Sequence, residues 1–229
     1  MSYAGSDYWD RYFVALDKAG SDLDWGGRWT EPFLARLREA KVQTILELGC
    51  GTGNDAARLA RMGFAVTATD FSTQAIKRAS ERFGSLGIAF RVVDMAQRLP
   101  FPSGSFDALM TNVAVHMFSD RQTRQIFKEA ARVVRPDGLL LLHVNSEADR
   151  SLRERRRPVA RELEPSYVLE ESGQTVRFFS REYLDELLSG WRVIELVHVE
   201  IEDAETGEPF KCVWRVVAEN RLDAPGLDS

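Results

Sequence analysis

The sequence predicts an α/β fold in which a doubly wound, mostly parallel sheet carries helices on both faces. Short apolar segments of strand length alternate with amphipathic segments of helical length between residues 44 and 144. This alternation is typical of parallel sheets, because each crossover needs a helix. The chain has 229 residues, of which 44% are hydrophobic and 28% charged, which is enough for one domain with a sizeable core.

The first expected strand, at 44–48, leads directly into a glycine loop. The glycines of this loop stand at alternate positions, Gly49, Gly51 and Gly53. A helix is expected to follow at 54–61, with Asn54 or Asp55 placed to cap its first turn. A glycine loop between a strand and a helix lets the backbone approach a ligand closely, with its amides pointing outward. The loop is therefore the first candidate for a ligand site.

The spacing of this loop argues against a dinucleotide site. Dinucleotide-binding loops read G-x-G-x-x-G, whereas this loop reads G-x-G-x-G. The shorter loop makes less provision for a pyrophosphate, and the carboxylate of Glu47, just before it, would repel one.

The remaining elements continue the alternation. Further strands are expected at 64–69, 88–93, 106–111, 139–144, 191–199 and 210–218. Further helices are expected at 72–83, 119–134 and 180–188. Ser119 and Gln122 have the spacing of a capping box, and a turn is expected at 136–138. The link between the last two strands, 200–209, is so short that it favours an antiparallel pair.

The first 43 residues precede this alternating region and are rich in aromatic side chains. We expect an amphipathic helix at 6–16, a glycine-hinged aromatic turn at 24–29 and a helix at 31–40 with Pro32 in its first turn. The aromatic side chains either form a lid over a ligand or simply pack against the edge of the sheet.

Residues 145–179 interrupt the alternation. They are charged, contain two prolines and include one β-rich patch, at 175–179. We interpret 145–179 as an insertion on the substrate side of a single domain that spans 1–229, with 1–43 as its N-terminal lid or cap.

Charge and composition argue against several kinds of partner. The formal net charge is −5 at pH 7, so neither nucleic acid nor a membrane is an expected partner. The arginines of 150–161 have Glu154 among them and Glu162 and Glu164 just after them, and are interpreted as a solvated helical face. Cys50 and Cys212 have no metal-ligand or disulfide spacing, and the chain starts with no signal-peptide pattern, so a cytoplasmic protein without a metal is expected.

The stretch Thr-Ile-Leu-Glu-Leu-Gly-Cys-Gly-Thr-Gly at 44–53 resembles motif I of class I S-adenosylmethionine-dependent methyltransferases. The resemblance covers 44–144, with a looser match in the last two strands. The aromatic start and the segments 177–183 and 212–217 are similar to bacterial small-molecule methyltransferases of the tellurite-resistance and thiopurine-type groups. The resemblance implies a seven-stranded, Rossmann-like sheet with six parallel strands and one antiparallel strand, and S-adenosylmethionine as cofactor.

Ligands of open parallel sheets bind outside the carboxyl ends of the strands, where several polar residues stand in this sequence. Asp70 is placed to bind the ribose hydroxyls, unless it only caps a helix, and Phe71 to pack on the adenine. Asp94 is placed to accept from the adenine amino group, with Met95 supplying an amide, and Glu47 suits the cationic end of the ligand. The expected cofactor-binding residues are Glu47, Gly49, Cys50, Gly51, Gly53, Asp70, Phe71, Asp94, Met95 and Asn112.

The acceptor is expected beyond the fourth strand. His116 follows Asn112 in the region that resembles motif IV of the family, and it either shapes the acceptor pocket or removes a proton as the catalytic base. His143 and Asn145 end the fifth strand on the same side. The expected substrate-binding residues are Tyr8, Tyr12, Trp25, Trp29, His116, His143 and Asn145.

The leading hypothesis is an enzyme that transfers a methyl group from S-adenosylmethionine to a small-molecule acceptor by direct in-line displacement. A methyltransferase of tRNA or protein is an alternative, supported only by the arginines of 150–161. A nicotinamide-dependent oxidoreductase is a second alternative, but the short glycine loop and the lack of a Tyr-x-x-x-Lys pair argue against it. A ligand-binding protein without catalytic activity is a third. The acceptor and the oligomeric state are left open.

Overall fold

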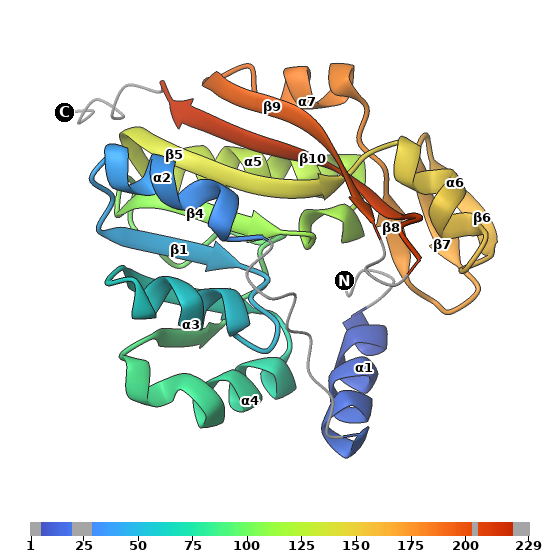
Figure 1. Ribbon diagram of the computed structural model, residues 1–229, viewed down its shortest axis with the longest axis horizontal. Helices are drawn as coiled ribbons and strands as arrows, with labels where there is room; N and C mark the ends of the chain where they lie inside the picture. The colour runs from blue at the N-terminus through green and yellow to red at the C-terminus, as the bar shows by residue number, and fades with distance from the viewer. Residues whose placement is uncertain (1–5, 20–28, 203–205, 222–229) are drawn as a thin grey trace.

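A computed structural model describes residues 6–19, 29–202 and 206–221 of the chain. Its centre is a seven-stranded sheet in the order β3-β2-β1-β4-β5-β10-β9 (Figure 1). These strands are β1 (Thr44–Leu48), β2 (Ala65–Asp70), β3 (Ala89–Val92), β4 (Phe106–Asn112), β5 (Val134–Asn145), β9 (Trp191–Glu202) and β10 (Pro209–Asn220). Only β10 runs antiparallel to its neighbours within this sheet. The predicted sheet of six parallel strands and one antiparallel strand is confirmed.

Helices cover both faces of this sheet (Figure 1). The alternation of side chains along β1 separates two cores: Ile45 packs with Phe33 and Leu59, and Leu46 with Phe127. The first core contains side chains of α2 (Glu31–Glu39), α3 (Asn54–Arg61) and α4 (Thr73–Phe83). The second contains side chains of α5 (Asp120–Val133) and α7 (Arg181–Leu187). Among the helices of the described residues, none is long and apolar enough to cross a membrane.

Helix α1 (Ser6–Ala19) lies outside these layers, beside α4 (Figure 1). The hydroxyl of Ser72 donates to Asp10 Oδ1 at 2.7 Å, which ties the two helices together at the start of α4. Short 3-10 turns complete the main layer, η1 (Gly84–Leu86) after α4 and η2 (Val115–Met117) after β4. Helix α1 thereby stands over the edge of the sheet where the parallel strands end.

Helix starts illustrate one confirmed and one wrong prediction. Ser119 and Gln122 form the predicted capping box at the start of α5. The prediction that Asn54 or Asp55 caps α3 is wrong, because the cap residue is Gly53, whose φ of 80° is left-handed and which has no side chain to bond. The Asn54 side chain instead donates to Thr52 Oγ1 at 3.1 Å.

The turn expected at 136–138 lies inside β5, which begins at Val134. The pairing with β4 jumps from Phe106–Val134 to Ala108–Leu139, and Asp137 has a left-handed φ of 58°. The strand therefore bulges at this point and resumes its pairing, because the extra residues are left out of the ladder.

The insertion contains more structure than its sequence predicted. Helix α6 (Ala148–Glu154) is followed by an antiparallel sheet of β6 (Val159–Glu164), β7 (Tyr167–Glu170) and β8 (Thr175–Arg177). The expectation of a single β-rich patch missed α6, β6 and β7. In β6, residues 160–162 are exposed and two of them are charged, Arg161 and Glu162, so the strand lacks the apolar alternation that would reveal it.

This small sheet holds the η2 turn by its backbone carbonyls. The hydroxyls of Tyr167 and Thr175 both donate to the Met117 carbonyl oxygen, at 3.0 and 2.8 Å. The Arg177 Nε donates to the Phe118 carbonyl oxygen at 3.1 Å. The insertion therefore fixes the backbone of the loop that follows β4.

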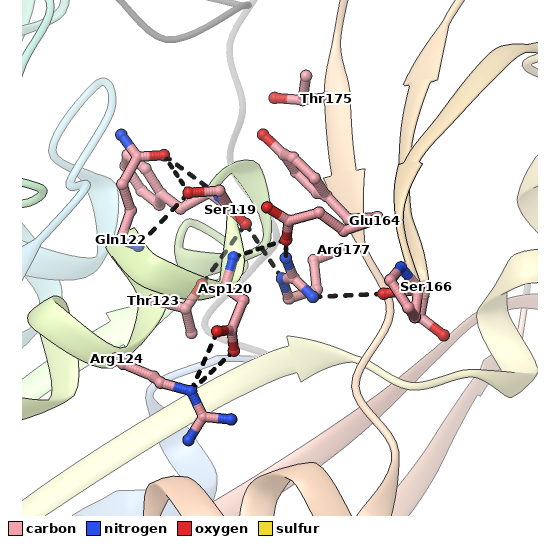
Figure 2. Close-up of polar contacts among 12 residues, drawn as sticks. Ser119, Asp120, Gln122, Thr123, Arg124, Glu164, Ser166, Thr175 and Arg177 are labelled. Atoms are coloured by element: carbon pink, nitrogen blue, oxygen red, sulfur yellow. Dashed lines mark hydrogen bonds and ion pairs between the residues drawn. The ribbon is translucent and has the colours of Figure 1, made fainter.

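A charged contact extends this attachment to α5. Arg177 pairs with Glu164, whose carboxylate also accepts the Asp120 amide at 2.8 Å. Figure 2 shows Glu164 and Arg177 beside the first turn of α5, next to the capping box of Ser119 and Gln122. Arg177 is buried, so this pair contributes more to the position of the insertion than an exposed ion pair would.

Candidate active site

A cavity of about 930 Å³ opens at the carboxyl ends of β1, β2 and β4. Its walls come from the glycine loop, α1, η2, α6 and the start of β10. The volume is that of a site for a small molecule with its cofactor, and the position is where open parallel sheets bind their ligands.

Most of the predicted site residues line this cavity. The lining residues from the predicted cofactor site are Glu47, Gly49, Cys50, Gly51, Asp70, Phe71, Met95 and Asn112. Those from the predicted substrate site are Tyr8, Tyr12, Trp29 and His116. Four predicted residues are not on its walls, namely Gly53, Asp94, His143 and Asn145. Trp25 and the predicted glycine hinge lie outside the described residues.

The glycine loop turns back tightly against its neighbours. A Cβ on Gly49, whose φ is +73°, would lie 2.4 Å from the Cβ of Ala114, so this position excludes a side chain. The amides of Gly49 and Cys50 donate to the Thr69 carbonyl oxygen at 2.8 and 2.9 Å, which ties the loop to β2. At Gly51 a Cβ would lie 3.6 Å from the Phe13 ring of α1. Helix α1 thus covers the loop.

Three carboxylates gather at this end of the cavity, Glu47, Asp55 and Asp70. The Glu47 side chain is 3% exposed, and its Oε2 has no hydrogen-bond partner within the described part of the chain. Burial, with the carboxylates of Asp55 and Asp70, raises the pKa of Glu47 well above its ordinary value. We call this group the acidic end of the cavity. A ligand with a cationic group would satisfy the free oxygen of Glu47 and favour the ionised form of its carboxylate.

Asp70 is anchored by two backbone amides. Gly51 N donates to its Oδ2 and Ser72 N to its Oδ1, both at 2.9 Å. Burial raises the pKa of Asp70 to about 6, although these two amides act in the opposite direction. Because each carboxylate oxygen accepts two hydrogen bonds, Asp70 retains acceptor capacity toward the cavity.

Asp94 faces its own turn. Its Oδ1 accepts the Ala96 amide at 2.9 Å, and its Oδ2 accepts from the Gln97 side chain at 3.5 Å. The neighbouring Met95 lines the cavity, whereas Asp94 does not.

Asn112 connects the acidic end to a buried histidine. Its Nδ2 donates to Asp55 Oδ2 at 3.0 Å, and its Oδ1 lies 2.9 Å from His143 Nδ1. His143 packs against the rings of Trp29 and Phe33, with centroids 5.0 and 4.9 Å apart. Burial, with Arg215 nearby, lowers the pKa of His143 to about 3. The neutral ring therefore orients Asn112 from behind the cavity wall.

His116 lies on the cavity wall in η2, as its place in the sequence predicted. It is 3% exposed, and within the described residues its Nδ1 has no hydrogen-bond partner. Burial, with Lys211 and Arg153 close by, lowers the pKa of His116 well below its ordinary value. The imidazole is therefore neutral at neutral pH, with its Nδ1 unsatisfied.

The opposite end of the cavity is lined by cations that the sequence analysis did not assign to the site. They are Arg153, Arg156, Arg157 and Lys211, which we call the basic end. The interpretation of the arginines of 150–161 as a solvated face fails for Arg153, whose side chain is 16% exposed. Arg156 and Arg157 line the cavity and are also exposed to solvent, so they lie where the cavity opens. Their position just after the carboxyl end of β5 was the available signal.

Lys211 reaches this end from the start of β10. Its Nζ donates to Asn145 Oδ1 at 2.7 Å and lies 3.7 Å from Asp149 Oδ2. The side chain is 11% exposed, and burial lowers the pKa of Lys211 to about 8, with Asp149 acting in the opposite direction. Asn145 therefore holds a lysine of the cavity wall and does not line the wall itself.

Aromatic side chains of α1 form a third part of the wall. Tyr8, Trp9, Tyr12 and Phe13 line the cavity, and the Tyr8 and Tyr12 rings stack with centroids 6.0 Å apart. Arg157 donates to the Tyr8 hydroxyl at 3.2 Å, so α1 touches the basic end as well as the glycine loop. Whether α1 opens and closes as a lid stays a prediction.

Comparison with known proteins matches the part of the chain that builds the acidic end. Residues 45–138 match the family described as "Methyltransferase domain". The chain is 32% identical over 139 residues to 27-O-demethylrifamycin SV methyltransferase of Amycolatopsis mediterranei, covering 59% of this chain and 48% of that protein. It is 36% identical over 161 residues to 2-methyl-6-phytyl-1,4-hydroquinone methyltransferase of Synechocystis, and this match covers 66% of this chain and 48% of that protein. The chain thus spans about half the length of these curated relatives.

Solved structures share the fold over nearly the whole chain. A SAM-dependent methyltransferase from Anabaena variabilis superposes with a TM-score of 0.72 at 13% identity, covering 96% of both chains. The 1,6-didemethyltoxoflavin-N1-methyltransferase of Burkholderia thailandensis, solved with 1,6-didemethyltoxoflavin and S-adenosylhomocysteine, superposes with a TM-score of 0.67 at 18% identity. This likeness covers 97% of the present chain and 92% of that one.

Proposed function

We propose that this chain, which contains a class I methyltransferase domain matched over residues 45–138, transfers a methyl group from S-adenosylmethionine to a small-molecule acceptor. The observation that carries the proposal is the unpartnered, buried oxygen of Glu47 beside a glycine loop that admits no side chain at Gly49. A ligand that brings a cationic group to the acidic end would satisfy this oxygen and offset the repulsion among the three carboxylates.

The residues of the acidic end fit S-adenosylmethionine. When bound, it would supply a methyl group on a cationic sulfur, so that the acceptor can bond to the methyl carbon while the sulfur leaves as a neutral thioether. Glu47 would bind its cationic amino acid end, and the free acceptor capacity of Asp70 would bind the ribose hydroxyls. Phe71 and Met95, which line the same part of the cavity, would pack against the adenine. Asp94 does not line the cavity, although its carboxylate retains acceptor capacity beyond its bonds to Ala96 and Gln97.

The protein's part in the transfer is to orient the acceptor and exclude water. The aromatic rings of α1 on one side and η2 on the other enclose the cavity between its two ends. The depressed pKa of His116 makes its imidazole a weak proton acceptor, so we assign His116 to shaping the acceptor pocket. The names of the relatives support a small molecule, since the two curated relatives are named for a rifamycin and a hydroquinone.

Calorimetry on the whole chain tests the donor. We expect S-adenosylmethionine and S-adenosylhomocysteine to bind and oxidised and reduced nicotinamide dinucleotides not to bind. Binding of a nicotinamide cofactor with no binding of S-adenosylhomocysteine would contradict the proposal. Transfer of radiolabelled methyl groups to extract fractions, sorted by acceptor size, would separate small acceptors from RNA and protein, and label found only in macromolecules would make the small-molecule assignment wrong.

A further inference from the structure

The basic end of the cavity contains more hydrogen-bond donors than the protein uses. Arg153 is satisfied, since its Nε donates to Glu170 at 2.6 Å and a terminal nitrogen donates to Gln174 at 3.0 Å. Arg156 and Arg157 are different. Among the described residues, neither has a carboxylate within 4.0 Å, although both line the cavity.

The contacts of these two arginines are to neutral groups. Arg156 donates to the carbonyl oxygens of Leu152, at 3.3 Å, and Phe210. Arg157 donates to the Tyr8 hydroxyl at 3.2 Å and to Gln174 at 3.5 Å. A guanidinium has five N–H donors in a planar fork that matches a carboxylate. Each arginine therefore retains donors that a ligand in the cavity can use.

Lys211 adds an ammonium group that is expensive to keep in this position. It is almost buried, and its described partners are the neutral Asn145 and the Asp149 carboxylate at 3.7 Å. Asp149 also accepts the Cys212 amide at 2.8 Å, so its charge is shared. A buried charge without a full counterion destabilises the empty site, and an anion in the cavity would remove this cost.

Charge at this end matches a monoanion. The four cations of the basic end stand against the carboxylates of Asp149, Glu170 and Glu171, which leaves a net charge of about +1. A carboxylate neutralises this charge, whereas a phosphate dianion would overcompensate it. Around the cations the wall is aromatic, with Tyr8, Tyr12 and Phe210.

We propose that the acceptor is a carboxylic acid with a flat, apolar body, whose carboxylate binds the basic end while its body packs against the aromatic wall. This proposal rests on the proposed methyl transfer and specifies its substrate class. Arg156 and Arg157 are exposed at the opening of the cavity, Lys211 is almost buried on its wall, and the volume of about 930 Å³ suits a small molecule. In this arrangement the carboxylate positions the acceptor, and the reacting atom lies toward the acidic end.

Matched pairs of acids and amides test this proposal. The probes are benzoate, 2-naphthoate, indole-3-acetate and hexanoate, each with its own carboxamide, titrated by calorimetry into the whole chain saturated with S-adenosylhomocysteine. We expect at least one aromatic acid to bind tenfold or more tightly than its amide, and hexanoate to bind more weakly than the aromatic acids. If no acid binds more tightly than its amide, the proposal is wrong.

Charge-removing variants locate the anion. Arg156→Gln and Lys211→Met should each reduce the preference for the acid over the amide fivefold or more. Arg155→Gln removes the same charge from an exposed residue of the same segment that does not line the cavity, so its preference should stay within twofold of the wild type. Equal losses in Arg155→Gln and Arg156→Gln would mean a general charge effect and would overturn the assignment. If Lys211→Met fails to fold, Arg156→Gln alone decides.

Failure of this inference is distinguishable from failure of the proposed function. Binding of S-adenosylhomocysteine without a preference for acids would leave the methyltransferase and remove the acidic acceptor. A preference for acids without binding of S-adenosylhomocysteine would leave the anion site and remove the methyltransferase.

Discussion

The two ends of the cavity differ in charge and in how the chain builds them. The acidic end comes from the carboxyl ends of consecutive parallel strands, with Glu47 in β1 and Asp70 at the end of β2. The basic end comes from elements far apart in the sequence, with Arg153 in α6 and Lys211 in β10. Under the proposed function, the shared fold would supply the donor's end, and the insertion with the last strand would supply the acceptor's end. Such a division would allow one fold to keep its donor and change its acceptor.

Opposite charges at the two ends give the cavity a direction. A cationic ligand is attracted to Glu47 and repelled by Lys211. An anionic ligand is attracted to Lys211 and repelled by Glu47. The two substrates of the proposed reaction would therefore enter in one relative orientation. Substitutions at one end should therefore change the affinity for one ligand and leave the affinity for the other unchanged.

The largest effect is expected at the acidic end, from Asp70→Asn. Loss of a charged hydrogen-bond acceptor costs about 1.5–3 kcal/mol, which is roughly a 10- to 150-fold loss of affinity for S-adenosylhomocysteine. The affinity for an aromatic acid should stay within about twofold, since the basic end is unchanged. Calorimetry measures both, with Asp137→Asn as the control because Asp137 is exposed and away from the cavity. An unchanged cofactor affinity would remove Asp70 from the site.

A smaller effect on ligand affinity is expected from removing the hydrogen bonds between the insertion and η2. Replacing both hydroxyls in the double variant Tyr167→Phe, Thr175→Val leaves the buried Met117 carbonyl without its two described donors, which costs about 1–3 kcal/mol. Urea unfolding should show this loss. Affinity for an acid should fall severalfold, while affinity for S-adenosylhomocysteine should hold. A loss shared equally by both ligands would mean that the insertion supports the whole cavity.

The smallest effect is expected from His116→Asn. Asparagine preserves a polar group of similar size, so a pocket-shaping role predicts that most of the turnover is retained. A catalytic base would instead show a loss of roughly 10²–10⁴ in turnover. The pH profile is a second readout, because the depressed pKa of His116 predicts no step near its ordinary value of about 6.5. A rate that rises through about 6.5 in the wild type and loses this step in the variant would contradict the assignment.

The acidic end was predictable from the sequence because its signals are local. A strand, a glycine loop and a helix follow one another within 44–61, and Asp70 directly ends the next strand. Parallel topology then brings these residues to one edge without further information. The cap of α3 was predicted wrongly because Asn54 and Asp55 are good caps by residue type, whereas the left-handed Gly53 already ends the loop.

The basic end was not predictable because its contacts join distant segments. The arginines of α6 stand among glutamates, a pattern that equally suits a solvated helix. Lys211 lies in a strand with no sign of its cavity position. His143 and Asn145 were assigned to the acceptor by their place at the end of β5, but their partners, Asn112 and Lys211, lie on other elements. Only the packed structure shows that these two residues support the wall from behind.

The most direct test of the two-ended cavity is the pH dependence of both affinities, measured on one protein between pH 5 and 9. Ionisation of Asp70, whose pKa is about 6, should raise the affinity for S-adenosylhomocysteine as pH rises through that value. The pKa of Lys211 is about 8, so its ammonium group should lose a proton above pH 8. The affinity for an aromatic acid should then fall by up to tenfold per pH unit.

The groups that face Lys211 shape this second curve. Asp149, Arg153 and Arg156 of the insertion act on it directly, and His116 stays neutral across the range. Asp70→Asn should flatten only the cofactor curve and Lys211→Met only the acid curve. We predict that the two affinities change in opposite directions with pH, the cofactor's rising through about 6 and the acid's falling through about 8. Two curves that rise or fall together would contradict the division of the cavity into an acidic and a basic end.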